Sequence, residues 1–178
     1  LIPATYMVMM IPALWGGKSL HHVLTVYLQQ AGNYNFISMN APNWYQLLPD
    51  IGSDVLYNLF SPMAMALGFA CVMAMCALVT MRRDRLSTDS TVLVCLLMIS
   101  GIAYFLPKMH ERYTFGADVL SLVLAVYAPR RIVLPLCFGF ASYVAYTAGL
   151  PGDRIMDLKW AAMFQMVAIA LTAAELWR

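Results

Sequence analysis

Chargeable side chains crowd into the hexapeptide Lys108-Met-His-Glu-Arg-Tyr113, which separates two apolar runs. Arg112 can bind phosphate through paired N–H donors, and Lys108 adds a second positive charge. His110 can exchange a proton near neutral pH, and Glu111 is a carboxylate. These residue types favour a site that binds an anionic headgroup. The alternative is ordinary interfacial charge, with the two cations extended to the membrane surface.

Asp118 interrupts the apolar run 113–129 that follows the hexapeptide. An acid at that depth is costly unless it faces a bundle interior or an aqueous cavity, and it usually marks function. If a helix begins near the histidine of the hexapeptide, Glu111 and Asp118 share a face, with Thr114 and Phe115 between them. The pattern predicts a polar pocket with cations at its rim and a carboxylate deeper.

The composition is that of a membrane protein. Of the 178 residues, 62% are hydrophobic and 11% are charged, whereas a soluble domain carries about 25% charged residues. The net charge of +2 gives no reason to expect a nucleic-acid partner. The cysteines lie within apolar runs without CxxC spacing, which indicates neither a zinc site nor a disulfide framework. These are Cys71, Cys76, Cys95 and Cys137.

Apolar runs along the chain predict an all-α polytopic transmembrane helix bundle of about six spans, because a crossing needs about 20 apolar residues. The runs are 1–17, 55–81, 90–107, 113–129, 132–152 and 160–174. We expect a single transmembrane domain over residues 1–178. Leu1 already lies in an apolar run without a basic leader, so we expect the C-terminal portion of a longer polypeptide.

Short connections at 82–89, 108–112 and 130–131 make consecutive spans antiparallel neighbours. One side then holds Arg82, Arg83, Arg85, Arg130, Arg131 and Arg178. The other holds Lys18, Lys108, Arg112, Arg154 and Lys159. The first set clusters as Arg in tight loops with few acids, so the positive-inside rule places it in the cytoplasm. The hexapeptide and the long loop 16–54 are therefore expected on the outer face.

The loop 16–54 begins with an amphipathic pattern over 18–30, which predicts an interfacial helix. Its apolar residues are Leu20, Val23, Leu24, Tyr27 and Leu28. The second half of this loop contains Asn40-Ala-Pro-Asn-Trp-Tyr-Gln46, whose Asn and Pro favour turns. One hypothesis is an interfacial anchor, with Trp44 and Tyr45 in the headgroup region. The other is a polar loop over a headgroup or sugar site, whose candidate residues are Asn40, Asn43, Tyr45 and Gln46.

The string LPKMHERYTFGADVLSLVLAVY at 106–127 resembles the MHERY-type motif of bacterial GT-C glycosyltransferases related to the eukaryotic GPI mannosyltransferases. The string YLQQAGNYNFISMNAPNWYQLLP at 27–49 is similar to the outer loop that precedes that motif in those proteins. The motif match carries over Asn40, Pro42, Asn43, His110, Glu111, Arg112 and Tyr113. The resemblance implies an enzyme of the bacterial inner membrane that takes sugar from a polyprenyl-phosphate donor on the periplasmic face.

In this interpretation Lys108, Arg112 and Tyr113 bind the donor phosphate, and His110, Glu111 and Asp118 are the catalytic candidates. Preorganised cations stabilise the charge that builds on a departing phosphate, which His110 could protonate. Glu111 would orient Arg112 or bind a sugar hydroxyl. The family usually takes its catalytic acid from an outer loop near the N-terminus, so this segment alone is expected to be inactive. Its expected partners are the donor, membrane lipid and the missing N-terminal half.

Other interpretations stay open at this point. A transporter or flippase for lipid-linked sugars or anions would use the same cationic site. A non-catalytic membrane assembly subunit would need no catalytic acid. The cofactor is undetermined, since a divalent metal would suit phosphate chemistry but no ligand cluster is visible in the sequence.

Overall fold

The computed structural model describes residues 2–32, 36–48, 53–82, 87–150 and 155–177. Seven α-helices make up most of this part of the chain, which confirms the all-α class. The chain divides into two compact units, residues 1–35 and 36–178. The boundary between them falls inside the loop predicted at 16–54.

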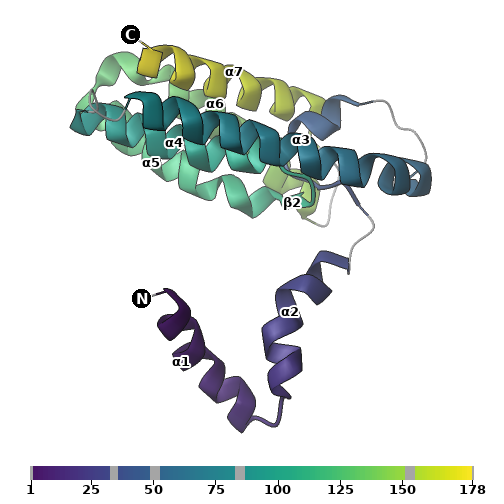
Figure 1. Cartoon of the computed structure of the whole chain (residues 1–178). Helices are drawn as coiled ribbons and strands as arrows, with labels where there is room; N and C mark the ends of the chain where they lie inside the picture. The colour runs from purple at the N-terminus through teal and green to yellow at the C-terminus, as the bar shows by residue number, and fades with distance from the viewer. Residues whose placement is uncertain (1, 33–35, 49–52, 83–86, 151–154, 178) are drawn as a thin grey trace. The chain divides into compact units, whose positions relative to one another are not determined.

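The first unit is a pair of helices, α1 (Ile2–Trp15) and α2 (Leu20–Gly32), joined at a tight turn (Figure 1). Gly17 makes the turn with a φ of 83°, a left-handed conformation that glycine adopts without steric cost. The Tyr6 hydroxyl donates to the carbonyl oxygen of Val23 at 3.0 Å and ties the helices together. The helix predicted over 18–30 is thus present as α2.

The second unit is a helical bundle in which consecutive helices lie side by side (Figure 1). Its helices are α3 (Ser53–Arg82), α4 (Thr88–Phe105), α5 (Phe115–Tyr127), α6 (Val133–Gly149) and α7 (Leu158–Trp177). The chain also returns to pack α7 against α4. Neighbouring helices follow from the short connections, as predicted.

Four helical segments of this unit are long and apolar enough to cross a membrane. They are Phe60–Met81, Thr88–Phe105, Pro129–Gly149 and Leu158–Trp177. Large apolar side chains lie exposed on them, including Met63, Leu136 and Trp160. A soluble protein rarely exposes apolar surface on this scale, so the chain is a membrane protein.

Both ends of α4 lie where the sequence places them. Ser87 precedes the helix with extended backbone, and its Oγ accepts a hydrogen bond from the amide of Ser90, the usual N-cap geometry. The helix ends at Phe105, two residues before Pro107, because a proline disfavours helical backbone in the residue that precedes it.

Small residues bring α6 and α7 into close contact. Ala141 and Ala145 on α6 face the same interface as Ala161 on α7, and all three are fully buried. Membrane helices associate through such small residues because backbones can then approach closely. This contact fixes the two C-terminal helices as one rigid pair.

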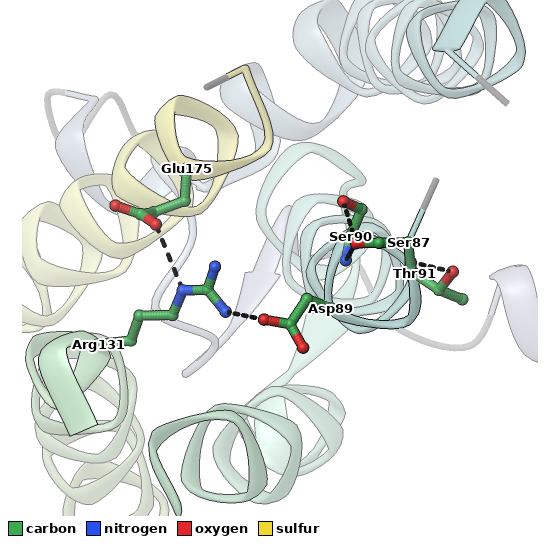
Figure 2. Close-up of polar contacts among 6 residues, drawn as sticks. All are labelled: Ser87, Asp89, Ser90, Thr91, Arg131 and Glu175. Carbon is green, nitrogen blue, oxygen red and sulfur yellow. Dashed lines mark hydrogen bonds and ion pairs between the residues drawn. The ribbon is translucent and has the colours of Figure 1, made fainter. Parts of the chain in front are cut away.

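Arg131 joins three helices at one end of the bundle (Figure 2). It lies in η4 (Pro129–Arg131) before α6. Its Nε lies 3.3 Å from a carboxylate oxygen of Glu175 on α7, and its Nη1 lies 3.3 Å from one of Asp89 on α4. The side chain is buried. Arg131, one of the loop cations used above to orient the chain, thus pairs with carboxylates from two other helices.

Candidate functional site

The loop and the turn that carry the two motifs are hydrogen-bonded to each other. The strand β1 (Ser38–Met39) pairs in parallel with β2 (Met109–His110). The amide of Lys108 donates to the carbonyl oxygen of Ile37 at 2.6 Å, and a bridge links Asn40 with His110. Motifs about 70 residues apart in the sequence therefore form one structure.

Backbone strain is concentrated at this junction. Among the described residues, Asn40 and Lys108 are the non-glycine residues with positive φ, at 57° and 61°. Left-handed backbone costs about 1 kcal/mol for most residues, less for Asn. Each lies next to one strand of the β1–β2 pair. Observed strain of this kind is common at ligand sites.

Tyr45 fastens the loop to the bundle. It lies in η1 (Trp44–Leu47) and is 6% exposed. Its hydroxyl is 2.9 Å from the carbonyl oxygen of Phe105 on α4 and 3.2 Å from that of Ala64 on α3. Burial raises the pKa of Tyr45 above its ordinary value, so the hydroxyl keeps the hydrogen that it donates. An anchor in the headgroup region, one of the two hypotheses for this residue, does not fit its buried position.

Two other residues of the predicted sugar loop face inward. Gln46 donates through Nε2 to the Ser38 Oγ at 2.9 Å and braces the loop internally. Asn43 is fully buried, and neither polar atom of its side chain has a hydrogen-bond partner among the described residues. Leaving a buried amide unpaired costs about 1–3 kcal/mol. Of the four loop candidates, Asn40 is the one bridged to the turn, through His110.

The turn itself has a different register from the one predicted. A short 3-10 helix, η3 (Glu111–Thr114), precedes α5, which begins at Phe115. With three residues per turn, this segment places Thr114 at 2% exposure against α6 and Phe115 outside at 61%. Thr114 and Phe115 were both predicted to lie on the helix face shared by Glu111 and Asp118, but only Thr114 faces the bundle.

A chain of hydroxyl groups leads from the turn to Asp118. Thr114 Oγ1 lies 2.8 Å from the carbonyl oxygen of Glu111 and 2.9 Å from Ser142 Oγ on α6. Ser142 Oγ donates to Asp118 Oδ1 at 2.9 Å. Thr114 has one hydroxyl hydrogen, so it can donate to only one of its two neighbours at a time. This chain holds the start of α5 against α6 and gives Asp118 the partner that its depth requires.

Asn40 and Glu111 converge on the last residue of α6. A Cβ atom built on Gly149 would lie 3.7 Å from Asn40 Nδ2 and 3.7 Å from Glu111 Cδ. On its other side, Glu111 Oε2 lies 3.8 Å from His110 Nδ1. Loop, turn and helix end thus bring an amide, a carboxylate and an imidazole to one place.

The remaining charges lie around this group. Arg112 is exposed, and no ion pair joins it to a described residue. Tyr113 is half-exposed, with its ring edge-to-face against His110 at a centroid distance of 5.7 Å. Tyr146 lies near the end of α6, on the same helix as Ser142. The predicted residues of the turn are therefore grouped, with Arg112 directed outward.

The contribution of α6 to the site was not apparent from the sequence. Ser142, Tyr146 and Gly149 lie in an apolar run that gave no local sign of a site. Gly149 is the last residue of α6, and its apolar neighbours give it no sign of a role in the site. Only the spacing of Ser142 and Tyr146, one helical turn apart on one face, hinted at a polar stripe.

The part of the chain that the structure describes contains no group of three or more His, Cys, Asp or Glu residues that could hold a metal ion. All four cysteines are free thiols. The site is thus built from a cation, an imidazole, a carboxylate and an amide, which together can bind a phosphate ester and hydroxyl groups.

No family model, curated protein or solved structure matched this chain.

Proposed function

We propose that this chain belongs to a membrane glycosyltransferase that moves a sugar from a polyprenyl-phosphate donor, and that it supplies the donor-binding site. One observation carries the proposal: the loop with Asn40 and the turn with His110 are paired as strands. The two segments that resemble motifs of such enzymes thus form one polar group beside apolar helices. A lipid-linked sugar needs both kinds of surface.

The residues suit the chemistry of the leaving group. Breaking a sugar–phosphate bond builds negative charge on the lipid phosphate, which a preorganised cation stabilises. Arg112 is exposed, with no ion pair to a described residue, so a carboxylate does not compete with the phosphate there. His110 lies beside Glu111 and can supply a proton or a hydrogen bond to the departing oxygen. Lys108 adds positive charge from the adjoining strained position.

The membrane topology in this proposal has six spans. The 3-10 turn and α5 together extend from Glu111 to Tyr127, a length of roughly 28 Å, close to the thickness of the hydrocarbon core at about 30 Å. The first span is α1. The interfacial segment is α2, whose Leu20 and Leu24 are more than half exposed. The positive-inside rule places the Asn40–Arg112 end on the outer, periplasmic face.

The catalytic acid in this proposal comes from elsewhere in the native polypeptide, as the resemblance implies. Asp118 is then a positioning residue, because its carboxylate binds Ser142 and thereby holds η3, the segment that carries Arg112. Glu111 is left to bind the sugar or to orient Arg112.

The test replaces Arg112 in the native full-length protein. Arg112→Ala should lower transfer from polyprenyl-phosphate mannose or polyprenyl-phosphate glucose by about 100- to 1,000-fold, with unchanged expression. Arg112→Lys should recover part of the rate, because it keeps the charge and loses the paired donors. Arg130→Ala is the matched control, since Arg130 is also exposed and lies in η4 beside Arg131.

Wild-type rates in Arg112→Ala would contradict the phosphate-binding role. Movement of the lipid-linked sugar across vesicle membranes, without transfer to any acceptor, would contradict the enzyme and favour a flippase.

A further inference from the structure

We propose that Gly149 is a specificity-determining residue, which keeps clear the space where Asn40 and Glu111 bind hydroxyl groups of the donor's sugar. This inference rests on the proposed function and deepens it. It assigns the sugar end of the donor to the junction of loop, turn and α6, where Glu111 is the chain neighbour of Arg112, the cation assigned to the phosphate.

The distances define this space. A methyl group at Gly149 would meet the Asn40 amide and the Glu111 carboxyl group at 3.7 Å each, and the Glu111 Cγ at 3.9 Å. These are ordinary van der Waals separations, so a methyl group fits against the protein. A larger side chain would occupy the same space as any ligand that touches both polar groups.

Glycine is not required at this position by the backbone. Gly17 is the described glycine with positive φ, and Gly149 is not in that region. The residue after it, Leu150, caps α6 with extended backbone. Glycine favours a helix less than alanine does, and the backbone at Gly149 does not require a glycine. The absence of a side chain is what remains to explain the residue.

The two polar groups suit vicinal hydroxyls. An amide offers two N–H donors and a carbonyl acceptor, and a carboxylate accepts from two directions. A sugar hydroxyl donates one hydrogen bond and accepts others, so adjacent hydroxyls can bind Asn40 and Glu111 at once. Neither the Asn40 amide nor the Glu111 carboxylate makes a hydrogen bond to a described residue; Glu111 has only the longer contact with His110. Both therefore keep their bonding capacity for a ligand.

Gly139 provides a matched control on the same helix. A Cβ built on Gly139 would meet nothing within 4 Å. Both glycines lie in α6, and of the two only Gly149 has Asn40 and Glu111 beside it.

The experiment compares donors in the native full-length protein. Transfer is measured from polyprenyl-phosphate mannose, a hexose donor, and from polyprenyl-phosphate arabinose, a smaller pentose donor. Gly149→Leu should raise KM for the hexose donor at least tenfold and for the pentose donor less, with kcat little changed, because the lost interaction is with the bound sugar. Gly149→Ala should raise KM about threefold. Gly139→Leu should change neither.

A second variant tests the same site without a substitution at Gly149, in case the Gly149 variants misfold. Asn40→Gly removes the amide and keeps a residue that accepts left-handed backbone, and it should raise KM for both donors about tenfold. Equal KM values in Gly149→Ala, Asn40→Gly and wild type would overturn the assignment of Gly149 while leaving the glycosyltransferase intact. A wild-type protein that transfers neither sugar would instead overturn the proposed function, and this assignment with it.

Discussion

The two ends of the helical bundle use their charges in opposite ways. At one end Arg131 is buried between Asp89 and Glu175, so its charge stabilises the packing of α4, α6 and α7. At the other end Arg112 is exposed, and the backbone at Asn40 and Lys108 is strained. Paired charge and relaxed backbone characterise a structural contact. Exposed charge on a strained, well-fastened backbone characterises a binding surface.

The difference extends to what fastens each end. Side-chain ion pairs join the helices at the Arg131 end. At the Asn40 end the described contacts are mostly between uncharged groups: a strand pair, the Tyr45 hydroxyl and the Thr114–Ser142 contact, with the Asp118 carboxylate behind Ser142. Neutral groups can hold the segments in place without neutralising Arg112. The comparison therefore predicts that stability and function are separable between the two ends.

The largest expected effect on stability is at Arg131. Arg131→Ala should lower the free energy of unfolding by about 2 kcal/mol, because it removes a buried cation that pairs with two carboxylates. Asp89 is well exposed and can be rehydrated, which keeps the loss below that of a fully buried pair. Unfolding by SDS in mixed micelles measures the change.

Arg130→Ala is the control at this end and should change stability by less than about 0.5 kcal/mol. Equal stabilities of the Arg131 and Arg130 variants would contradict the structural role of Arg131.

A smaller effect is expected at Tyr45. Tyr45→Phe should lower the free energy of unfolding by about 1 kcal/mol, because the loop loses its hydrogen bond to the bundle. Hydrogen exchange at the Lys108 amide should become faster, since that amide bonds to Ile37 in the same loop. Tyr143→Phe is the matched control, because Tyr143 is exposed on α6. Unchanged exchange at Lys108 would show that the strand pair alone holds the loop.

The smallest effect is expected from relief of strain. Lys108→Gly should change the free energy of unfolding by no more than about 0.5 kcal/mol, in either direction, because release of left-handed strain offsets the lost side chain. Lys159→Gly, in the first turn of α7, should instead destabilise by up to about 1 kcal/mol, since glycine weakens a helix. Thermal unfolding in detergent compares the two. A larger loss at Lys108 than at Lys159 would mean that its backbone carries no strain.

Helices and their ends were predictable because the information is local. Ser87 and Pro107 mark the limits of α4 within a few residues of where they act, and the 3.6-residue period of α2 lies in one segment. The 3-10 geometry of η3 was not predictable, because it depends on Thr114 meeting Ser142 of α6. That contact changed which residues of the turn face the bundle.

Only part of the site could be predicted from the sequence, for the same reason. The residue types of the turn indicated phosphate chemistry without any knowledge of neighbours. The pairing of β1 with β2, the place of Gly149 and the ion pairs of Arg131 all join segments far apart in the sequence. Periodicity and composition contain no record of such contacts, so the residues of α6 could not be assigned.

The parallel direction of the β1–β2 pair has a consequence for how the protein assembles. Parallel strands cannot be joined by a tight hairpin and need a long crossover, and here the crossover consists of α3 and α4. The strand that carries Ser38 comes first in the chain, and its partner strand follows only after both helices. The junction at Asn40 can therefore form only once α3 and α4 have folded back against each other, so protection of the Lys108 amide from exchange reports that this helix pair is in place.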